Sequence, residues 1–474
     1  MISLKQIKLL QFSFLCLLSL TLLLHITLSY IPFVAVVLRL LLTHLHLSIF
    51  LSICMLLSIF CGLKTRPSPV FLINYACFKP PPHRKCLYGV AESFLLRNQH
   101  FTQETIEFMR KIYLKSGLGD ETYAPPFIFE EDTTPTLKCA IQEAQEGIFS
   151  SIDALLSKTL IDPLSIDIVI VTCGSFSHSP SLSSLIVNHY NLKPDVKTYN
   201  LSGMGCGSGV LSIDCAARVL RASGKVQHAL VVITESTTLN WYSGDNRSML
   251  VTNCIFRVGC TAAMLTNDRS RRSVAKMELV DMLRTHHGAD DRSYRAAFQE
   301  EDDKGYTGVA LTKDLVRVAG VNLREHLTIL APRVLPLSQL VLYAYSVAMA
   351  ALSRGESKPT VPDFTAAFEH MCIHTGGKAV IEQVARVLRL RGEVTEPARM
   401  SLNRFGNTSS SLVFYELAYF EAKKRVKKGD KMWMIAFGTG FKIGSLVWKW
   451  LQNSAQENDN PWNDCIQRYP LDAW

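Results

Sequence analysis

Two long uncharged apolar stretches near the N-terminus constrain this chain more than any other feature. Residues 9–28 and 47–63 contain no Asp, Glu, Lys or Arg and are rich in Leu, Ile and Phe. As helices they are about long enough to cross the hydrocarbon core of a bilayer, the second only just. The sequence therefore predicts a membrane hairpin of two helices over residues 1–63. A signal peptide followed by an apolar stretch of mature chain is the alternative.

The charges beside these stretches predict the side of the membrane on which the rest of the chain lies. Lys5 and Lys8 precede the first stretch, Lys64 and Arg66 follow the second, and Arg39 stands between them. Because basic flanks stay in the cytosol, the large remainder is expected there. The thirteen cysteines form no CxxC pair, which favours reduced, buried thiols over a disulfide framework.

Composition excludes some functional classes. The chain has 474 residues, of which 48% are hydrophobic and 19% charged, and this is too apolar for a disordered protein. A net charge of +9 suits an anionic partner such as a membrane surface or a phosphorylated cofactor. No dense basic stripe with interleaved aromatic residues is present, so nucleic acid is not expected as a partner.

Beyond the hairpin the sequence alternates between predicted strands and helices. A proline-rich tether and an N-terminal cover are expected over residues 64–130, and a polar surface tail over residues 452–474. Buried strands are predicted at 166–172, 228–234 and 431–437, and helices at 141–160, 210–223, 335–351 and 377–388. This alternation is typical of an α/β fold with a buried, mainly parallel sheet.

A glycine-rich segment around Cys206 carries the strongest chemical signal. The sequence Gly-Met-Gly-Cys206-Gly-Ser-Gly comes directly before the predicted helix that begins near Val210. Glycines permit a tight turn, and a helix N-terminus supplies partial positive charge that favours thiolate over thiol. We therefore expect a nucleophilic Cys206; the alternative is a small buried thiol in a glycine-rich turn. The glycines match neither a dinucleotide fingerprint nor a serine nucleophile elbow.

Two C-terminal segments offer partners for a thiolate nucleophile. His374 stands at a predicted strand-to-helix junction, where active-site residues of α/β folds gather, and Asn407 stands in a Gly/Ser/Thr-rich loop. His370 and His374 have the spacing of a zinc-binding pair. No Glu stands in an HExxH frame and no third ligand is found, so no metal is expected.

The ordered motifs of this chain resemble those of the plant 3-ketoacyl-CoA synthases, the membrane-bound condensing enzymes of very-long-chain fatty acid elongation. The resemblance covers nearly the whole length. It rests on the two apolar stretches, the turn at Cys206 and the segments NYACFKPP (74–81), SGLGDETY (116–123), LNWY (239–242), RSML (247–250), RTHHGADD (284–291), FEHMCIH (368–374), RFGNTSSS (404–411) and AFGTGF (436–441).

The resemblance implies a thiolase-like fold of two similar halves, layered α-β-α-β-α. The first half would cover residues 131–357, with an inserted segment, and the second residues 358–451. Cys206 would take an acyl group from a long-chain or very-long-chain acyl-CoA. Malonyl-CoA would then lose CO2, and His374 and Asn407 would stabilise the enolate that forms. The product is a 3-ketoacyl-CoA two carbons longer, and no metal or redox cofactor is needed.

The resemblance also implies supporting residues and partners. Backbone amides of Cys206 and of the turn containing Gly438 and Gly440 would hold the thioester oxygen, and His286 and His370 would support the site. The implied setting is the endoplasmic reticulum membrane, with two spans and the catalytic domain in the cytosol. The implied partners are a second copy of the chain and the reductases and dehydratase of the elongase complex.

Some positions depart from the family pattern. Asn403 stands where the family usually has histidine, and Gly207 stands where serine usually follows the nucleophile. These departures leave open a catalytically weak paralogue that scaffolds or modulates an elongase complex. A soluble polyketide-type condensing enzyme is a third interpretation, and the apolar N-terminal stretches count against it.

Overall fold

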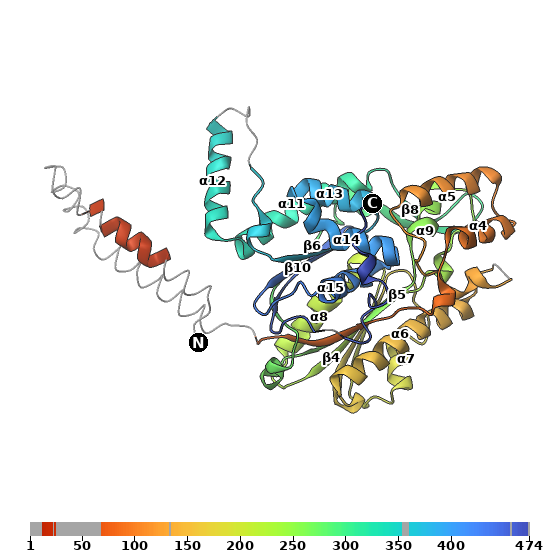
Figure 1. Ribbon diagram of the computed structural model, residues 1–474, viewed down its shortest axis with the longest axis horizontal. Coiled ribbons are helices and arrows are strands. Elements are labelled where there is room, and N and C mark those ends of the chain that lie inside the picture. Colours follow the sequence, from red (N-terminus) through yellow and green to blue (C-terminus); the bar gives the residue numbers. More distant parts are fainter. Residues whose placement is uncertain are drawn as a thin grey trace. The chain divides into compact units, whose positions relative to one another are not determined.

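The computed structural model describes residues 12–21, 23–24, 68–131, 134–352, 360–455 and 457–472. The chain divides into two compact units, residues 1–67 and 68–474, and the second unit holds the sheet and its helices (Figure 1). Across the described ranges, no helix is long and apolar enough to span a bilayer. The predicted span at 47–63 lies outside these ranges, and of the span at 9–28 only residues 12–21 and 23–24 lie within them.

A mixed sheet of nine strands runs through the second unit, in the order β3-β2-β4-β5-β1-β6-β11-β10-β9. Its strands are β1 (Phe71–Cys77), β2 (Ile166–Cys173), β3 (Lys197–Ser202), β4 (His228–Glu235), β5 (Gly259–Thr266), β6 (Met277–His286), β9 (His370–Ile373), β10 (Lys431–Gly438) and β11 (Lys442–Trp450). Strands β7 (Ala297–Glu301) and β8 (Thr307–Leu311) form a separate antiparallel pair.

Strand pairing repeats across the sheet and reveals two similar halves. In one half β2 runs parallel to β4, β4 antiparallel to β5, and β5 antiparallel to β1. In the other half β9 runs parallel to β10, β10 antiparallel to β11, and β11 antiparallel to β6. The halves join where β1 pairs with β6. Strand β6, which belongs to the predicted first segment 131–357, pairs along its length with β11 of the predicted second segment.

The helices form layers on both sides of this sheet. They are α4 (Tyr88–Arg97), α5 (Gln103–Lys115), α6 (Leu137–Thr159), α7 (Leu182–His189), α8 (Ser208–Ala222), α9 (Arg247–Ile255), α10 (Asp291–Tyr294), α11 (Leu315–Val334), α12 (Leu337–Leu352), α13 (Lys378–Leu388), α14 (Gly392–Phe405) and α15 (Leu412–Ala422). Helices α8 and α15 lie between the two halves, α6 and α7 cover the first half, and α11 and α13 cover the second.

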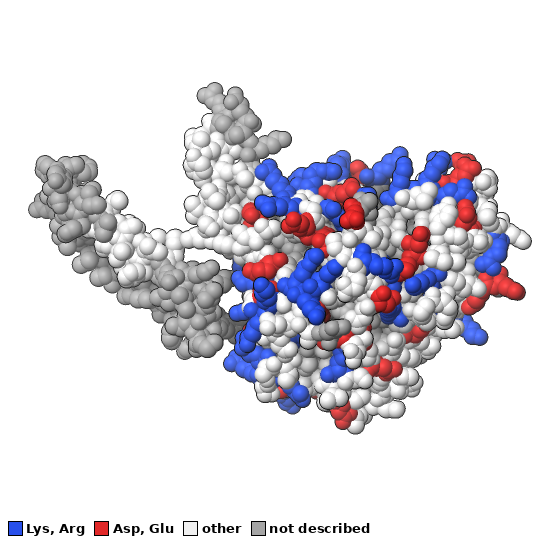
Figure 2. Space-filling view, viewed as in Figure 1, with Lys and Arg blue, Asp and Glu red and all other residues white. Residues whose placement is uncertain are grey.

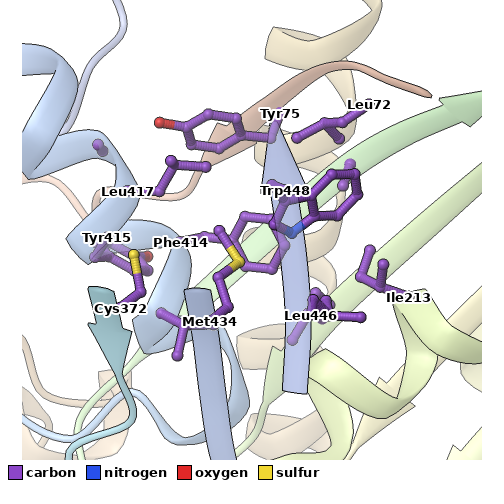
Figure 3. Packing of buried hydrophobic residues seen from close by; sticks show 14 of the residues in the cluster. Leu72, Tyr75, Ile213, Cys372, Phe414, Tyr415, Leu417, Met434, Leu446 and Trp448 are labelled. Atoms are coloured by element: carbon purple, nitrogen blue, oxygen red, sulfur yellow. The ribbon is translucent and has the colours of Figure 1, made fainter. Parts of the chain in front are cut away.

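Successive residues on a strand point to opposite faces, and here both faces are buried. On β2, Ile170 packs in the central cluster around α8, whereas Val171 packs against α6 on the other side. On β10, Met434 points to the central cluster, where it lies near Phe414 of α15 (Figure 3), and Trp433 points to the outer one. The order of layers is therefore α-β-α-β-α, as expected.

The segment predicted as a proline-rich tether contains a central strand. Residues Phe71–Cys77 form β1, which is buried between β5 and β6. The prolines at 69 and 80 only flank this apolar run, so every residue of the strand keeps the N–H that a central position needs. The tether prediction was wrong here because prolines are typical of linkers, whereas the apolar run between these prolines forms a strand.

The polar tail is anchored to the core by Trp462. This side chain is fully buried, and its indole N–H donates to the carbonyl of Tyr415 on α15 at 2.8 Å. The ring packs edge-on against Phe405, with 5.0 Å between the ring centroids. A surface tail was expected because the residues around Trp462 are polar, but this one large apolar group finds a place in the core.

We expect Trp462→Ala to lower the free energy of unfolding by about 3–5 kcal/mol, because it leaves a large cavity and removes a buried hydrogen bond. Urea unfolding of the detergent-solubilised protein measures the loss. Leu164→Ala is the control, since that side chain is 57% exposed. Equal loss in the two variants would show that the tail contributes nothing to the core.

Candidate active site

A cavity of about 580 Å³ opens beside the carboxyl ends of strands from both halves. Cys206, His374 and Asn407 all line it. Cys206 follows β3, His374 follows β9 and Asn407 follows α14. The sheet therefore brings together three residues that the sequence places far apart, at the edge where α/β folds gather their active sites.

The turn that carries Cys206 is pressed against the end of β10. A Cβ added to Gly207 would lie 2.8 Å from the backbone nitrogen of Gly438, and one added to Gly438 would lie 2.3 Å from the carbonyl oxygen of Met204. Gly205 also adopts a positive φ of 60°. Glycine is needed at these positions because backbone approaches backbone more closely than a side chain allows. The departure at Gly207 therefore fits its surroundings.

Cys206 is a partly buried residue whose thiol lies in a polar setting. Its Sγ lies 3.6 Å from the hydroxyl oxygen of Ser409. Burial raises the pKa of Cys206 to about 12; the hydroxyl of Ser409 and the nearby amide of Asn407 oppose the rise, while the negative charge of Glu235 adds to it. The raised pKa favours the neutral thiol at neutral pH in the protein without substrate, because burial disfavours the charged form.

His374 is buried beside the cavity as a neutral imidazole. Its backbone N–H donates to the carbonyl of Ile435 at 2.9 Å, which continues the pairing of β9 with β10. The side chain is 1% exposed, and neither ring nitrogen has a hydrogen-bond partner among the described residues. Burial lowers the pKa of His374 to about 3. At neutral pH the ring therefore offers one N–H donor and one acceptor nitrogen.

Backbone hydrogen bonds hold Asn407 in place, and the NH2 group of its side chain is left to donate to a ligand. Its N–H donates to the carbonyl of Ile255, and its own carbonyl accepts from the N–H of Arg257 at 2.9 Å. Its side-chain oxygen accepts from the N–H of Ser409 at 2.9 Å, while the buried Nδ2 has no partner among the described residues. Ser409 adopts a positive φ of 55°, a strained backbone of the kind found at active sites.

The cavity is thus lined by two buried hydrogen-bond donors that the described protein groups leave unsatisfied. Leaving such a donor unpaired costs about 1–3 kcal/mol. Groups of this kind are rare and call for an explanation. A ligand oxygen that accepts from both His374 and Asn407 would remove the cost, and it would lie beside the Cys206 thiol.

Glu235 and Ser409 are further residues of this site that local sequence patterns did not predict. The carboxylate of Glu235 accepts from the hydroxyls of Ser409 at 2.8 Å and Ser175 at 2.6 Å, and from the N–H groups of Gly174 and Ser175. A hydrogen-bonded chain therefore runs from Glu235 through Ser409 to Cys206. The one available signal was that Glu235 ends an apolar strand at the carboxyl edge of the predicted sheet.

Three of the supporting candidates also line the cavity: His286, Gly438 and Gly440. His286 is exposed at the mouth, where its Nδ1 accepts from the N–H of Gly288 at 3.0 Å. Lys442 lines the same mouth and donates from Nζ to the carbonyl of Thr439 at 2.9 Å. The mouth is therefore polar and basic.

The other two supporting candidates, His370 and Asn403, are not among the residues that line the cavity. His370 is at the opposite end of β9, where its Nε2 lies 2.8 Å from the carboxylate of Asp430. The amide of Asn403 donates to the carbonyl of Gly117 and accepts from the hydroxyl of Tyr469 at 3.2 Å. Within the described ranges, no three His, Cys, Asp or Glu residues are grouped to hold a metal ion.

Part of the cavity wall is apolar and comes from α4, α5, α9 and the segment between β4 and α9. Its apolar residues include Ala91, Leu95, Ile106, Met109 and Trp241. The ring of Trp241 packs edge-on against that of Phe94, with 5.2 Å between their centroids. One end of the cavity thus suits polar chemistry, and another part suits a hydrocarbon chain.

Comparison with known protein sequences identifies related condensing enzymes. The family described as FAE1/Type III polyketide synthase-like protein matches residues 62–352, and the 3-oxoacyl-[acyl-carrier-protein (ACP)] synthase III C-terminal family matches residues 365–450. The 3-ketoacyl-CoA synthase 4 of Arabidopsis thaliana is 44% identical over 407 residues, which cover 86% of this chain and 79% of that protein. The 3-ketoacyl-CoA synthase 11 of the same plant is 46% identical over 86% of this chain and 80% of its own length.

Solved structures share the fold. CsyB complexed with CoA-SH superposes with a TM-score of 0.62 at 18% identity, covering 80% of this chain and 100% of that one. A type III pentaketide synthase from Neurospora crassa gives a TM-score of 0.62 at 17% identity, covering 80% and 99%. At this low sequence identity the matches are evidence for the fold alone. The shared fold confirms the expected thiolase-like architecture.

The raised pKa of Cys206 predicts a steep pH dependence of its alkylation. Only the thiolate reacts, so the rate with iodoacetamide should rise about tenfold per pH unit from pH 7 to pH 10. An ordinary thiol with a pKa of about 8.5 levels off within this range. Mass spectrometry of the peptide containing Cys206 measures the rate, with N-acetylcysteine in parallel. A plateau below pH 8 would mean that the thiol is activated without substrate.

Proposed function

Because this chain belongs to the FAE1/Type III polyketide synthase-like family, among its 3-ketoacyl-CoA synthases, we propose that it condenses malonyl-CoA with a long-chain or very-long-chain acyl-CoA. The observation that carries the proposal is the pair of unsatisfied buried donors, His374 and Asn407, beside the thiol of Cys206. The apolar inner wall of the same cavity supports an acyl chain as part of the substrate.

The first step transfers the acyl group to Cys206. Its Sγ forms a bond to the thioester carbon, the bond from that carbon to the CoA sulfur breaks, and CoA leaves as a thiol. The proton that Cys206 loses is the one that the CoA sulfur gains. Backbone N–H groups of Cys206 and of the turn with Gly438 and Gly440 would hold the thioester oxygen.

The second step removes CO2 from malonyl-CoA. The bond to the carboxylate carbon breaks, and its electron pair passes into an enolate whose oxygen accepts hydrogen bonds from His374 and Asn407. A neutral imidazole and an amide stabilise the enolate without protonating its carbon. Donors of this kind contribute about 3–4 kcal/mol each to the transition state. The low pKa of His374 keeps the ring in this form.

In the third step the enolate carbon attacks the acyl group. A carbon–carbon bond forms, the bond to Sγ of Cys206 breaks, and the thiolate takes up a proton from water. The product is a 3-ketoacyl-CoA two carbons longer than the acyl group that entered. This scheme uses no metal or redox cofactor. The basic side chain of Lys442 at the cavity mouth is suited to the phosphates of CoA.

Two observations favour an active enzyme over a scaffolding paralogue. Asn403, the most prominent departure from the family pattern, is not among the residues that line the cavity. Gly207, the departure beside the nucleophile, lies against the backbone of Gly438 and leaves no room for a side chain. The residues that would perform the chemistry are all present.

The proposed cellular setting rests on the sequence. The apolar stretches at 9–28 and 47–63 support anchoring in the endoplasmic reticulum membrane, and their basic flanks support a cytosolic catalytic body. Elongation reduces and dehydrates each 3-ketoacyl product, so the reductases and dehydratase of that pathway are the proposed partners, together with a second copy of this chain.

Intact-protein mass spectrometry tests the assignment of the three residues. After incubation with acyl-CoAs, the wild type should gain one acyl mass, and Cys206→Ala should gain none. His374→Ala and Asn407→Ala should still be acylated, but each should lower the rate of condensation about a hundredfold or more. The readout for condensation is 3-ketoacyl-CoA formed from malonyl-CoA.

His370→Ala is the matched control for this experiment, because His370 is outside the cavity on the same strand. If it lowered condensation as much as His374→Ala, the effect would come from damage to β9 rather than to the site. Product formation by Cys206→Ala at the wild-type rate would refute the covalent mechanism.

The apolar wall predicts that acyl chain length responds to cavity size. Ala91 of α4 lines the cavity, so Ala91→Phe should fill part of it. The rate with the longest accepted acyl-CoA should fall about tenfold relative to a shorter one. Leu96→Phe is the control, because Leu96 is 61% exposed on the same helix. An unchanged chain-length profile for Ala91→Phe would show that the acyl group lies elsewhere.

A further inference from the structure

Helix α12 (Leu337–Leu352) exposes an unusual amount of apolar surface. None of its 16 residues is charged, and 12 of them are exposed. Figure 2 shows it as a white projection, free of blue and red, beside a body whose surface carries many charges. The large apolar side chains that are exposed are Leu337, Val341, Leu342, Tyr343, Tyr345, Val347, Met349 and Leu352.

Two polar side chains of α12, Gln339 and Ser346, are used within the protein. Gln339 accepts through Oε1 from the N–H of Asp363, and Ser346 accepts through Oγ from the N–H of Thr360. At 100° per residue, Gln339 and Ser346 share one narrow stripe with the buried Ala350. The segment that contains Thr360 and Asp363 covers this stripe. More than half of the helix circumference is left apolar and uncovered.

The base of α12 lies close to the point where the N-terminal part of the chain enters the sheet. Arg333, in the last turn of α11, pairs with Asp281 and donates to the carbonyl of Met282. Two residues before Asp281 on the same strand, the N–H of Leu279 donates to the carbonyl of Val70. Helix α12 and the chain before residue 68 therefore leave the body from neighbouring points on β6.

The closeness of α12 to this entry point indicates what covers the apolar helix. The 67 residues before that entry point contain the uncharged stretches 9–28 and 47–63, for which a bilayer is the predicted environment. Lys64 and Arg66 stand just before the entry point. Basic residues at that place suit the headgroup layer of a membrane.

We propose that α12 is a second membrane contact of this protein, one that enters a single leaflet of a phospholipid bilayer. A helix of 16 residues is about 24 Å long, which is shorter than the roughly 30 Å of the hydrocarbon core, so it cannot cross. A groove on a protein covers only one stripe of a helix. Lipid contacts most of a helix's circumference, and this matches the wide apolar arc of α12. Tyr343 and Tyr345 add the amphipathic rings that favour the interface.

The contact has a mechanical consequence. An anchor through the N-terminal segment alone would leave the catalytic body free to swing about one point. A second contact that starts from the same strand fixes which edge of the body faces the membrane. This inference does not depend on the catalytic proposal, because it uses neither the cavity nor its residues.

Photo-cross-linking in the full chain tests the proposal. p-Benzoylphenylalanine replaces Leu342 or Val347, which lie on two sides of the exposed arc, in protein reconstituted in phosphatidylcholine vesicles. Leu342→p-benzoylphenylalanine and Val347→p-benzoylphenylalanine should both give phospholipid adducts by mass spectrometry. Leu160→p-benzoylphenylalanine is the matched control, because Leu160 is 88% exposed on another helix end. The adduct yield at the two α12 positions should exceed that of the control at least fivefold.

Two outcomes would overturn the proposal. Lipid adducts no more abundant than in the Leu160 control would show that α12 stays in water. Cross-links at α12 to a second copy of the chain, in place of lipid, would show that the helix is a protein interface. Condensing activity, measured on each substituted protein before irradiation, confirms that it is folded, so neither outcome can be assigned to misfolding.

Discussion

The pairing of β1 with β6 is the interaction on which the rest of the structure depends. It is short, with Phe71 opposite Glu278 and Leu72 opposite Met277, yet it makes one sheet out of two half-sheets. Helices α8 and α15 are held between the halves as a result. That arrangement places the end of β10 against the turn of Cys206, so the cavity exists only because both halves are present and joined.

Burial governs the chemistry of the site. The same low-dielectric surroundings raise the pKa of Cys206 to about 12 and lower that of His374 to about 3, so both groups are neutral without substrate. Such a pair avoids the cost of a buried ion pair and keeps the donors of His374 and Asn407 free for an oxygen that becomes negative during reaction. The reactive thiolate is then needed only as the acyl group arrives.

Local sequence predicted much of the fold because several elements carry strong local patterns. Helix α6 and strands β2, β4 and β10 were located from apolar runs and periodicity alone. Strand β1 was not predicted because the prolines on either side of it are typical of a linker. The buried place of Trp462 was missed because one apolar residue in a polar stretch gives no periodic signal. Ser409 was missed because a hydrogen bond between distant segments leaves no mark on the local sequence, and Glu235 was missed because its one signal was its place at the end of β4.

The sequence by itself determined which residues could carry out the chemistry: a cysteine between glycines before a helix, and a histidine and an asparagine at the ends of later elements. It also fixed the apolar character of α12. Only the tertiary structure decided that Cys206, His374 and Asn407 share one cavity while His370 and Asn403 do not line it. It alone decided that the thiol is neutral and that α12 stays uncovered. The physical reason is that burial and proximity depend on which distant segments pack together.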